Sequence, residues 1–196
     1  MAIPREDFNI FNKIQMINLI TLFDLIYIAG FLDGDGAIIA QFVTRDDYKW
    51  KYQIRLSIQF TQHTKRSIYL TKLKDIIGAG SVRHRTKGII LLGDSLNESL
   101  NTSKVNVSET VSDYVITANQ SVLALLKLLQ PYLRIKQKQA DLAITLLEQL
   151  PLAKNDKVKF IELVDIVDQI ASLNDSKVSK RTLTGAVVKE VLKNIK

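Results

Sequence analysis

A strict alternation of apolar and polar residues between Lys51 and Gln62 constrains the fold more than any other feature of the sequence. The apolar positions, which share one face, are Ile54, Leu56, Ile58 and Phe60. The polar positions, which share the other face, are Gln53, Arg55, Ser57, Gln59 and Thr61. A period of two residues is typical of a strand that is buried on one side only. The segment therefore predicts a strand in a sheet with one covered and one open face.

Neighbouring segments extend this strand into two strand pairs. Ala37–Thr44 also alternates, and the polar turn Arg45–Lys49 joins it to the first strand as a hairpin. A second pair is predicted at Ser81–Lys87 and Val111–Ala118. The helices expected around the pairs are Phe23–Phe31 with Asp24 as N-cap, Thr64–Ile77 with Thr64 as cap, Ser121–Gln130, Gln137–Leu150, Val158–Leu173 and Thr182–Asn194. The apolar side of the second helix is expected to contain Ile68, Leu73, Ile76 and Ile77, with Gly78 at its end. This order favours an α+β fold, with an antiparallel sheet, helices on one face and additional C-terminal helices.

Length and composition indicate one sizeable domain. The chain has 196 residues, 46% of them hydrophobic, with no cysteine and two histidines. Disulfide scaffolds, cysteine-ligated zinc and thiol chemistry are therefore excluded, and no apolar run reaches the roughly 18 residues of a membrane span. We expect an extension over residues 1–22, one domain over 23–180 with a long loop at about 88–110, and a C-terminal helix or tail over 181–196.

Positive charge is concentrated in the middle of the chain, whose overall net charge is +7. Residues 45–87 contain eleven Lys or Arg and three Asp or Glu, a net charge of +8. Residues 1–44 have a net charge of −3, and residues 88–196 have one of +2. A basic chain of this kind favours polyanionic partners.

The open face of the predicted sheet has the side-chain types that read base edges. Arg pairs with guanine, Gln with adenine and Asp with cytosine, while apolar groups contact the thymine methyl. The residues expected on this face or at its hairpin turn are Ile39, Gln41, Val43, Arg45, Tyr48, Gln53, Arg55, Ser57, Gln59, Arg83, Arg85, Asp113 and Val115. A solvated sheet face without a partner is the alternative, which the density of Gln and Arg and the local positive charge disfavour.

An acidic turn, Asp33-Gly34-Asp35-Gly36, lies between a predicted helix and a predicted strand. Two glycines in four residues end a helix and allow a sharp bend, so a flexible acidic turn is one interpretation. A hard-metal site is the other, because one carboxylate and one glycine carbonyl, completed by waters and substrate phosphates, commonly hold Mg²⁺. One chain offers too few carboxylates here for two metal ions, whereas two chains that meet at this turn supply enough.

Small residues precede the acidic turn on the same predicted helix. Ala29 and Gly30 permit the close approach of another helix, either within the core or from a second copy of the chain. A two-fold pairing of this helix would bring two copies of Asp35 together.

The segment Ile28-Ala29-Gly30-Phe31-Leu32-Asp33-Gly34-Asp35-Gly36 resembles the LAGLIDADG signature of homing endonucleases. Further similarity to the single-motif, homodimeric subgroup encoded by group I introns lies at Thr61-Gln62, at 130–140 and at 167–177. The resemblance covers roughly residues 24–180, and the loop at 88–110 is longer than the hairpin turn usual in this subgroup. It implies an αββαββα core, with a saddle-shaped sheet, whose signature helices pair across a dimer axis. Ala29, Gly30 and Asp33 are expected at that interface.

By the same resemblance, the chain is expected to cleave double-stranded DNA with Mg²⁺, for which Mn²⁺ would substitute, and without a small-molecule cofactor. Asp35 matches the catalytic metal ligand of the family, and Gly34 matches the residue whose carbonyl also reaches the metal. Gln62 matches the residue that orders water, while Arg66 and Lys136 match a basic pair near the scissile phosphates.

Three further residues receive roles from the resemblance. Asp33 is expected to cap or hydrogen-bond at the helix end instead of ligating metal, and Lys177 and Lys180 match contacts to backbone phosphates. One motif per chain implies a homodimer in which each subunit reads one half-site.

The expected target is long and pseudo-palindromic. A ribbon of about 10 residues spans roughly 34 Å, about one turn of DNA, so the full site would be on the order of 20 base pairs. The break would be staggered, and the resemblance places the enzyme in a chloroplast or mitochondrion, with no membrane partner. Two alternatives stay open at this point, an intron RNA maturase and a non-cleaving DNA-binding protein of the same fold.

Overall fold

The computed structural model describes residues 20–86, 110–174 and 183–194. Its elements are α2 (Leu22–Asp35), β1 (Gly36–Thr44), β2 (Tyr52–His63), the 3₁₀ turn η1 (Thr64–Arg66), α3 (Ser67–Ile77), β3 (Ser81–Thr86), β4 (Thr110–Ile116), α4 (Asn119–Leu129), the 3₁₀ turn η2 (Gln130–Tyr132), α5 (Gln137–Ala153), α6 (Lys157–Ser172) and α7 (Gly185–Lys193). This succession confirms the expected α+β class. Nearly all of the expected loop at 88–110 lies outside the described residues, as do residues 1–19, Lys177 and Lys180.

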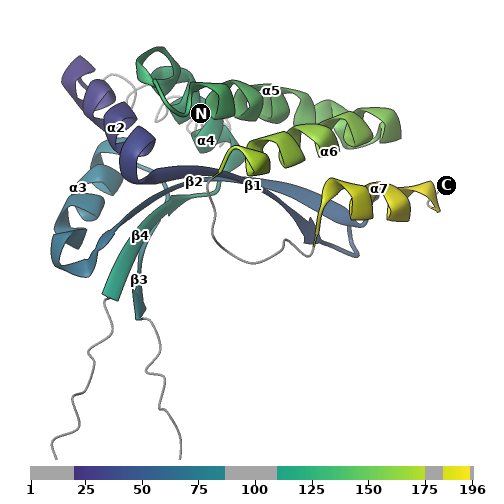
Figure 1. Ribbon diagram of the computed structural model, residues 1–196, viewed down its shortest axis with the longest axis horizontal. Coiled ribbons are helices and arrows are strands. Elements are labelled where there is room, and N and C mark those ends of the chain that lie inside the picture. The colour runs from purple at the N-terminus through teal and green to yellow at the C-terminus, as the bar shows by residue number, and fades with distance from the viewer. Residues whose placement is uncertain (1–19, 87–109, 175–182, 195–196) are drawn as a thin grey trace, which may run out of the picture.

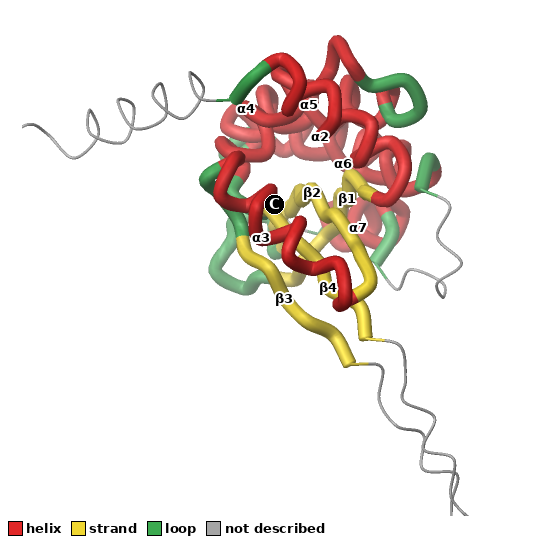
Figure 2. The backbone as a smooth tube through the Cα atoms, turned by 90° about the vertical axis from the view of Figure 1, so that its left-hand side faces the viewer, coloured by secondary structure: helices red, strands yellow, loops and turns green. Residues whose placement is uncertain are grey.

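The strands form one antiparallel sheet in the order β1-β2-β4-β3. β1 pairs with β2 from Gly36↔Phe60 to Thr44↔Tyr52, and β4 pairs with the last residues of β2 from Ile58↔Ile116 onward. Helices α4, α5 and α6 lie along one face of the curved sheet (Figure 1), and Figure 2 shows the same helical layer on one side of β1 and β2. The opposite face is the one that the alternation predicts to be polar.

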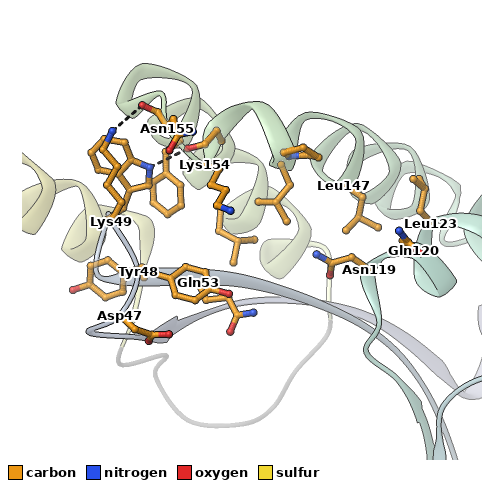
Figure 3. Close-up of a pocket in the computed structure, with 17 residues that line it drawn as sticks. Asp47, Tyr48, Lys49, Gln53, Asn119, Gln120, Leu123, Leu147, Lys154 and Asn155 are labelled. Carbon is orange, nitrogen blue, oxygen red and sulfur yellow. Dashed lines mark hydrogen bonds between the residues drawn. The ribbon is translucent and has the colours of Figure 1, made fainter. Parts of the chain in front are cut away.

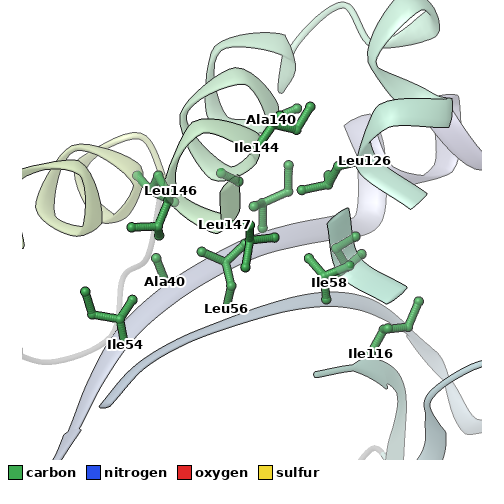
Figure 4. Packing of buried hydrophobic residues seen from close by; sticks show 14 of the residues in the cluster. Ala40, Ile54, Leu56, Ile58, Ile116, Leu126, Ala140, Ile144, Leu146 and Leu147 are labelled. Carbon is green, nitrogen blue, oxygen red and sulfur yellow. The ribbon is translucent and has the colours of Figure 1, made fainter. Parts of the chain in front are cut away.

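The core lies between the sheet and the helical layer. Alternate strand residues point toward the helices and are buried, and each buried Leu or Ile side chain stabilises the fold by roughly 1.5–3 kcal/mol. The residues that meet in this layer include Ala40, Ile54, Leu56, Ile58 and Ile116 from the sheet and Leu126, Ala140, Ile144, Leu146 and Leu147 from the helices (Figure 4).

The start of α2 differs from the sequence prediction. Thr21 is the N-cap, and its hydroxyl accepts the backbone N–H of Asp24 at 3.1 Å. Asp24 is the third helical residue, and its Oδ2 accepts the backbone N–H of Thr21 at 3.0 Å. The prediction of Asp24 as the cap is therefore wrong. Thr21 and Asp24 form a capping box, in which each side chain accepts the backbone N–H of the other residue.

The start of α3 also differs, because the 3₁₀ turn η1 precedes the helix. His63 caps this turn, since its Nδ1 accepts the backbone N–H of Lys65 at 3.1 Å, so the predicted cap at Thr64 is wrong. Leu73 and Ile77 are buried as predicted, whereas Ile68 is 71% exposed and Leu70 is buried instead. The helix ends as predicted at Gly78, whose φ of 71° is the left-handed conformation that favours glycine.

The C-terminal helices pack in succession, α6 against α5 and α7 against α6. α5 extends to Ala153, beyond the predicted end at Leu150, and α6 packs against it. α7 is fastened to α6, because Asp168 Oδ2 accepts the backbone N–H of Gly185 at 2.8 Å and Lys189 Nζ pairs with Asp165 at 2.5 Å. Among the described residues, the helices are all too short or too polar to cross a bilayer.

Candidate active site and nucleic-acid interface

Asp33 anchors the end of α2 through its buried carboxylate. Its Oδ2 accepts the backbone N–H of Arg134 at 2.7 Å and that of Ile135 at 3.2 Å, and its Oδ1 accepts that of Lys136 at 2.9 Å. Hydrogen bonds to a charged acceptor are stronger than those between neutral groups. Asp33 therefore ties the turn before α5 to the end of α2, which is the hydrogen-bonding role that the sequence indicates for it.

Asp35, two residues later, presents its carboxylate to solvent. Gln62 Nε2 donates to Asp35 Oδ2 at 2.6 Å. The two residues meet because α2 passes into β1 at Gly36, and Gly36 pairs with Phe60 near the end of β2. A Cβ on Gly36 would lie 2.8 Å from the Leu32 Cα and 2.9 Å from the Leu32 backbone oxygen, so only glycine allows this direct passage from helix to strand.

Two basic residues lie at the same end of the sheet. Lys136 Nζ donates to the backbone oxygen of Asp33 at 2.6 Å, which holds its ammonium group beside the acidic turn. Arg66 lies in η1, four residues after Gln62, and is exposed. Within the described residues the Arg66 guanidinium has no hydrogen-bond or ion-pair partner, so it remains available to an anion.

The oxygen atoms at this end suit a divalent cation only in part. The Asp35 carboxylate and the Gly34 carbonyl are the kind of ligands that Mg²⁺ prefers, and space is open around Gly34 because no atom lies within 4 Å of a Cβ placed there. Among the described residues, three or more His, Cys, Asp or Glu side chains never come together in a metal-binding group. The residues therefore fit a metal ion that is also held by phosphate, water and a second chain.

The open face of the sheet contains eleven of the predicted base-reading residues. Cross-strand partners share a face, and the register pairs Gln41 with Arg55, Gln59 with Val115, and Arg83 with Asp113. The residues on this face are Ile39, Gln41 and Val43 of β1, Gln53, Arg55, Ser57 and Gln59 of β2, Arg83 and Arg85 of β3, and Asp113 and Val115 of β4. The other two, Arg45 and Tyr48, lie in the hairpin turn.

Asp113 differs from the expectation that it offers a free carboxylate to a base. It is 5% exposed, and its Oδ1 accepts from Gln59 Nε2 at 2.9 Å, from Thr61 Oγ1 at 2.7 Å and from Arg85 Nη2 at 2.9 Å. Arg85 Nε also pairs with its second oxygen. Because its oxygens are already hydrogen-bonded, Asp113 holds Gln59 and Arg85 in place. Ser57, at 9% exposed, is likewise nearly covered in the chain alone.

The exposed side of α2 forms an apolar stripe. Phe23 is 83% exposed and Tyr27 is 57% exposed, and Gly30 and Gly34 continue the same helix face at the next turns. Ala29 and Asp33, which the family resemblance implies at a dimer interface, are 0% and 9% exposed, because they face the core of their own chain. Of the three predicted interface residues, only Gly30 lies on the exposed face.

A separate apolar cavity of about 800 Å³ lies between the β1–β2 hairpin and the helices (Figure 3). Its walls come from the hairpin, α4, α5 and the start of α6, and include Trp50, Leu123, Leu147 and Phe160. The four predicted catalytic residues do not line it. The cavity is therefore distinct from the site at Asp35.

Sequence reasoning gave no role to two polar residues that hold other polar groups of the predicted interface in place. Thr61 shares the Asp113 carboxylate, and Asp47 pairs with Arg45 in the hairpin turn. The Arg45 hydrogen bond holds the pKa of the Asp47 carboxyl below its ordinary value. The signal for Thr61 was its place in the alternating strand, whereas the spacing of Arg45 and Asp47 alone does not reveal their contact.

Comparisons with known proteins agree with this architecture. A family model described as LAGLIDADG endonuclease matches residues 28–102. The DNA endonuclease I-CreI from Chlamydomonas reinhardtii is 44% identical over 158 residues, which cover 81% of this chain and 83% of the relative. The DNA endonuclease I-CvuI from Chlorella vulgaris is 33% identical over 169 residues, which cover 86% and 89%.

Solved structures show the same fold. The crystal structure of I-CvuI in complex with its target in the presence of Ca has a TM-score of 0.72 at 31% identity, covering 88% of this chain and 94% of that one. A second I-CvuI complex, with the I-CreI target and Mg, has uncleaved DNA and the same TM-score of 0.72. The signature at the end of α2, the sheet behind it and these relatives show that the chain belongs to the LAGLIDADG homing endonuclease family.

Proposed function

We propose that two copies of this chain form a site-specific endodeoxyribonuclease that makes a staggered double-strand break in a long, pseudo-palindromic site. The observation that carries the proposal is the Asp35–Gln62 contact of 2.6 Å at the end of an open sheet face rich in Gln and Arg. The relatives are named DNA endonucleases, and the solved complexes of one of them, I-CvuI, contain DNA. The sheet would lie in the major groove, where base pairs are distinguishable.

A homodimer completes the site. The Phe23, Tyr27, Gly30 and Gly34 face of α2 is exposed, although the Tyr27 ring also contacts Tyr69 of α3, and a two-fold pairing of this face is self-complementary. Both copies of Asp35 follow this face at the end of their helices, so the pairing brings them together. Each half of the dimer would then read one half-site and act on one strand.

Asp35 and the Gly34 carbonyl would hold Mg²⁺, and Mn²⁺ is expected to substitute because it accepts the same oxygen ligands. When bound, the metal lowers the pKa of water and neutralises charge on the phosphate and the leaving oxygen. Gln62 fixes the orientation of the Asp35 carboxylate and offers an amide to order water. Lys136 and Arg66 stabilise the additional negative charge that develops on the phosphate.

Two further parts of the proposed function are the contacts to backbone phosphates and the location of the enzyme in the cell. Lys177 and Lys180 are proposed to contact backbone phosphates, since they follow α6 in a basic segment. A chloroplast or mitochondrial location is proposed from the group I intron resemblance, and the two relatives come from Chlamydomonas reinhardtii and Chlorella vulgaris.

The test is a cleavage selection with purified protein and a plasmid library of long pseudo-palindromic sites, in Mg²⁺ and in parallel in Ca²⁺. We expect linear plasmids that share one sequence in Mg²⁺ only. Asp35→Asn should abolish cleavage of that sequence and retain binding. Glu148→Gln, which removes an exposed carboxylate of α5 on the helical side, is the matched control and should cleave normally.

Three outcomes would contradict the proposal in different ways. Plasmids that are bound in both metals and never cut would indicate a non-cleaving DNA-binding protein. Cleavage that survives Asp35→Asn would remove Asp35 from the mechanism. Absence of both binding and cleavage, together with binding of the host intron RNA, would favour a maturase.

A further inference from the structure

The turn between β1 and β2 is fastened to the helical layer at two points. Trp50 is 5% exposed, and its Nε1 donates to the backbone oxygen of Ala153 at 2.9 Å. Lys49 Nζ donates to the backbone oxygen of Asn155 at 3.1 Å (Figure 3) and lies 4.6 Å from the Trp50 ring centroid. These contacts give the exposed residues of the turn a fixed base on the rest of the molecule.

Within this turn, the Arg45 guanidinium is held along one edge and across one face. Its Nε donates to Asp47 Oδ1 and its Nη2 to Asp47 Oδ2, both at 2.8 Å. The guanidinium carbon lies 5.2 Å from the centroid of the Tyr48 ring. Asp47 therefore fixes the rotation of the guanidinium, and Tyr48 fixes its plane. The side chain is still 42% exposed, so a ligand can reach it.

The donors that remain on Arg45 are those of its far end. A guanidinium has five N–H donors, of which Asp47 uses two, so three remain on the two terminal nitrogens. Two of these form the end-on fork that matches the O6 and N7 acceptors of guanine in the major groove. An arginine held in this way loses less conformational entropy on binding than an arginine that rotates freely.

The turn lies at the end of β1 that is opposite Asp35. β1 has nine residues, and at about 3.3 Å per residue it separates the turn from the acidic end by roughly 30 Å. At about 3.4 Å per base pair this corresponds to roughly nine base pairs. A base read by Arg45 is therefore in the outer part of each half-site, far from the bond that is cut.

We propose that Asp47 is a positioning residue for base specificity, which holds Arg45 so that its free end reads a guanine in the outer part of each half-site. This inference rests on the proposed function, because it requires the open sheet face to lie in the major groove. It also assigns different roles to the two acids of one turn. Asp47 orients Arg45, whereas the neighbouring Asp46 side chain has no partner among the described residues.

That difference supplies a matched pair of variants. Asp47→Ala and Asp46→Ala remove the same charge from the same turn, and only the first releases Arg45. The measurement is sequence-specific binding in Ca²⁺ to a set of sites in which each outer base pair is randomised in turn. We expect Asp47→Ala to lower the preference for guanine at one outer position by about tenfold, and Asp46→Ala to leave it unchanged. Arg45→Ala should remove the preference at the same position.

Thermal unfolding of each variant verifies that it is folded, and Asp47→Asn, which keeps the side-chain volume, replaces Asp47→Ala if the latter unfolds. The proposal is overturned if the base preferences of Asp47→Ala match those of the unmodified chain, or if both acidic variants change them alike. If the unmodified chain shows no sequence-specific binding at all, the proposed function itself fails, and this inference fails with it. If Asp47→Ala lowered the base preference equally at every position, the variant would have a general loss of affinity, and the positioning role would be rejected.

Discussion

Two acidic turns, one at the end of α2 and one between β1 and β2, each contain a pair of aspartates that have different partners. At the end of α2, Asp33 is buried and accepts three backbone N–H groups, while Asp35 is exposed. In the hairpin turn, Asp47 binds the side chain of Arg45 in the open, and Asp46 has no side-chain partner in the described residues. In each turn, one aspartate therefore holds a backbone segment or an arginine, whereas the other does not, since Asp35 accepts only the Gln62 amide.

The comparison teaches that burial decides what a holding acid contributes. A buried carboxylate that satisfies backbone donors stabilises the fold, because its loss leaves those donors without partners away from water. An exposed carboxylate that pairs with one side chain contributes little to stability, since such pairs are worth about 0–1 kcal/mol. Its effect is on the orientation of the arginine.

The largest expected effect on stability is that of Asp33→Ala. Removal of this carboxylate leaves three backbone N–H groups of the turn before α5 unsatisfied, and we expect a loss of about 3 kcal/mol in the free energy of unfolding. Asp35→Ala, the matched control two residues away, should change it by less than about 0.5 kcal/mol. Urea unfolding followed by circular dichroism measures both. Equal losses for the two variants would contradict the division of roles at this turn.

The next effect concerns catalysis. Lys136→Met removes the ammonium group that donates to the Asp33 carbonyl, and we expect the cleavage rate to fall by about 100-fold because charge on the phosphate loses a stabilising partner. The stability should change by no more than about 1 kcal/mol. Single-turnover cleavage of the selected site gives the rate. Lys138→Met, on the first turn of α5, is the control and should cleave at a rate within a few-fold of that of the unmodified chain. An equal loss of rate in both variants would contradict a specific role of Lys136.

Tyr114 is a buried hydrogen-bonding residue that, in contrast to Asp33, is uncharged at neutral pH. Tyr114 is fully buried, its hydroxyl donates to the backbone oxygen of Ala79, and burial raises its pKa above the ordinary value of 10.0. As the pH rises past about 10 the unfolded chain loses this proton first, so the folded state loses stability there. Tyr114→Phe should cost about 1 kcal/mol at neutral pH and make the decline above pH 10 less steep.

Tyr69 provides the check on this alkaline effect. Its pKa is also raised by burial and then by the nearby Tyr27, so some decline should persist in Tyr114→Phe. The measurement is the free energy of unfolding between pH 8 and pH 11. An identical slope in the variant and the unmodified chain would exclude Tyr114 as a source of the decline.

The smallest effect lies in the hairpin turn itself. Lys51 has a φ of 61°, which an L-residue adopts at a cost, so Lys51→Gly should be neutral or stabilise the fold by about 0.5 kcal/mol. Gly78→Ala, at a φ of 71°, is the reverse experiment and should destabilise it by about 1 kcal/mol. Thermal unfolding compares the two, and a stabilising Gly78→Ala would contradict the strain argument.

Much of the fold was predictable because its dominant signals are local. The alternation along residues 51–62 depends only on strand geometry, and the register places Arg55, Gln59 and the other polar residues on the face that it indicates. The end of α3 at Gly78 was predictable because a left-handed cap needs glycine. The cap at Thr21 was missed, because two reciprocal hydrogen bonds, and not a single acidic residue, set the first turn of α2.

The candidate site was predictable in its residues and not in their contacts. The signature residues Gly34 and Asp35, and Gln62 at the strand end, stand out in the sequence, and the structure brings Asp35 and Gln62 within 2.6 Å. The burial of Ala29 and Asp33 was not predictable from the helix alone, because α2 is apolar on both sides. Which side faces the core depends on the strands and on the turn before α5.

The sequence by itself determined the class of the fold, the face of the sheet that stays polar and the family of the chain, since these depend on spacing along the chain. Only the tertiary structure decided which aspartate of each turn is used to hold another group. Asp33 meets residues 134–136 across about a hundred positions of sequence, and Asp113 meets Gln59 and Arg85 across three strands. Such partners are set by packing and by the need to satisfy buried donors, and no local pattern encodes them.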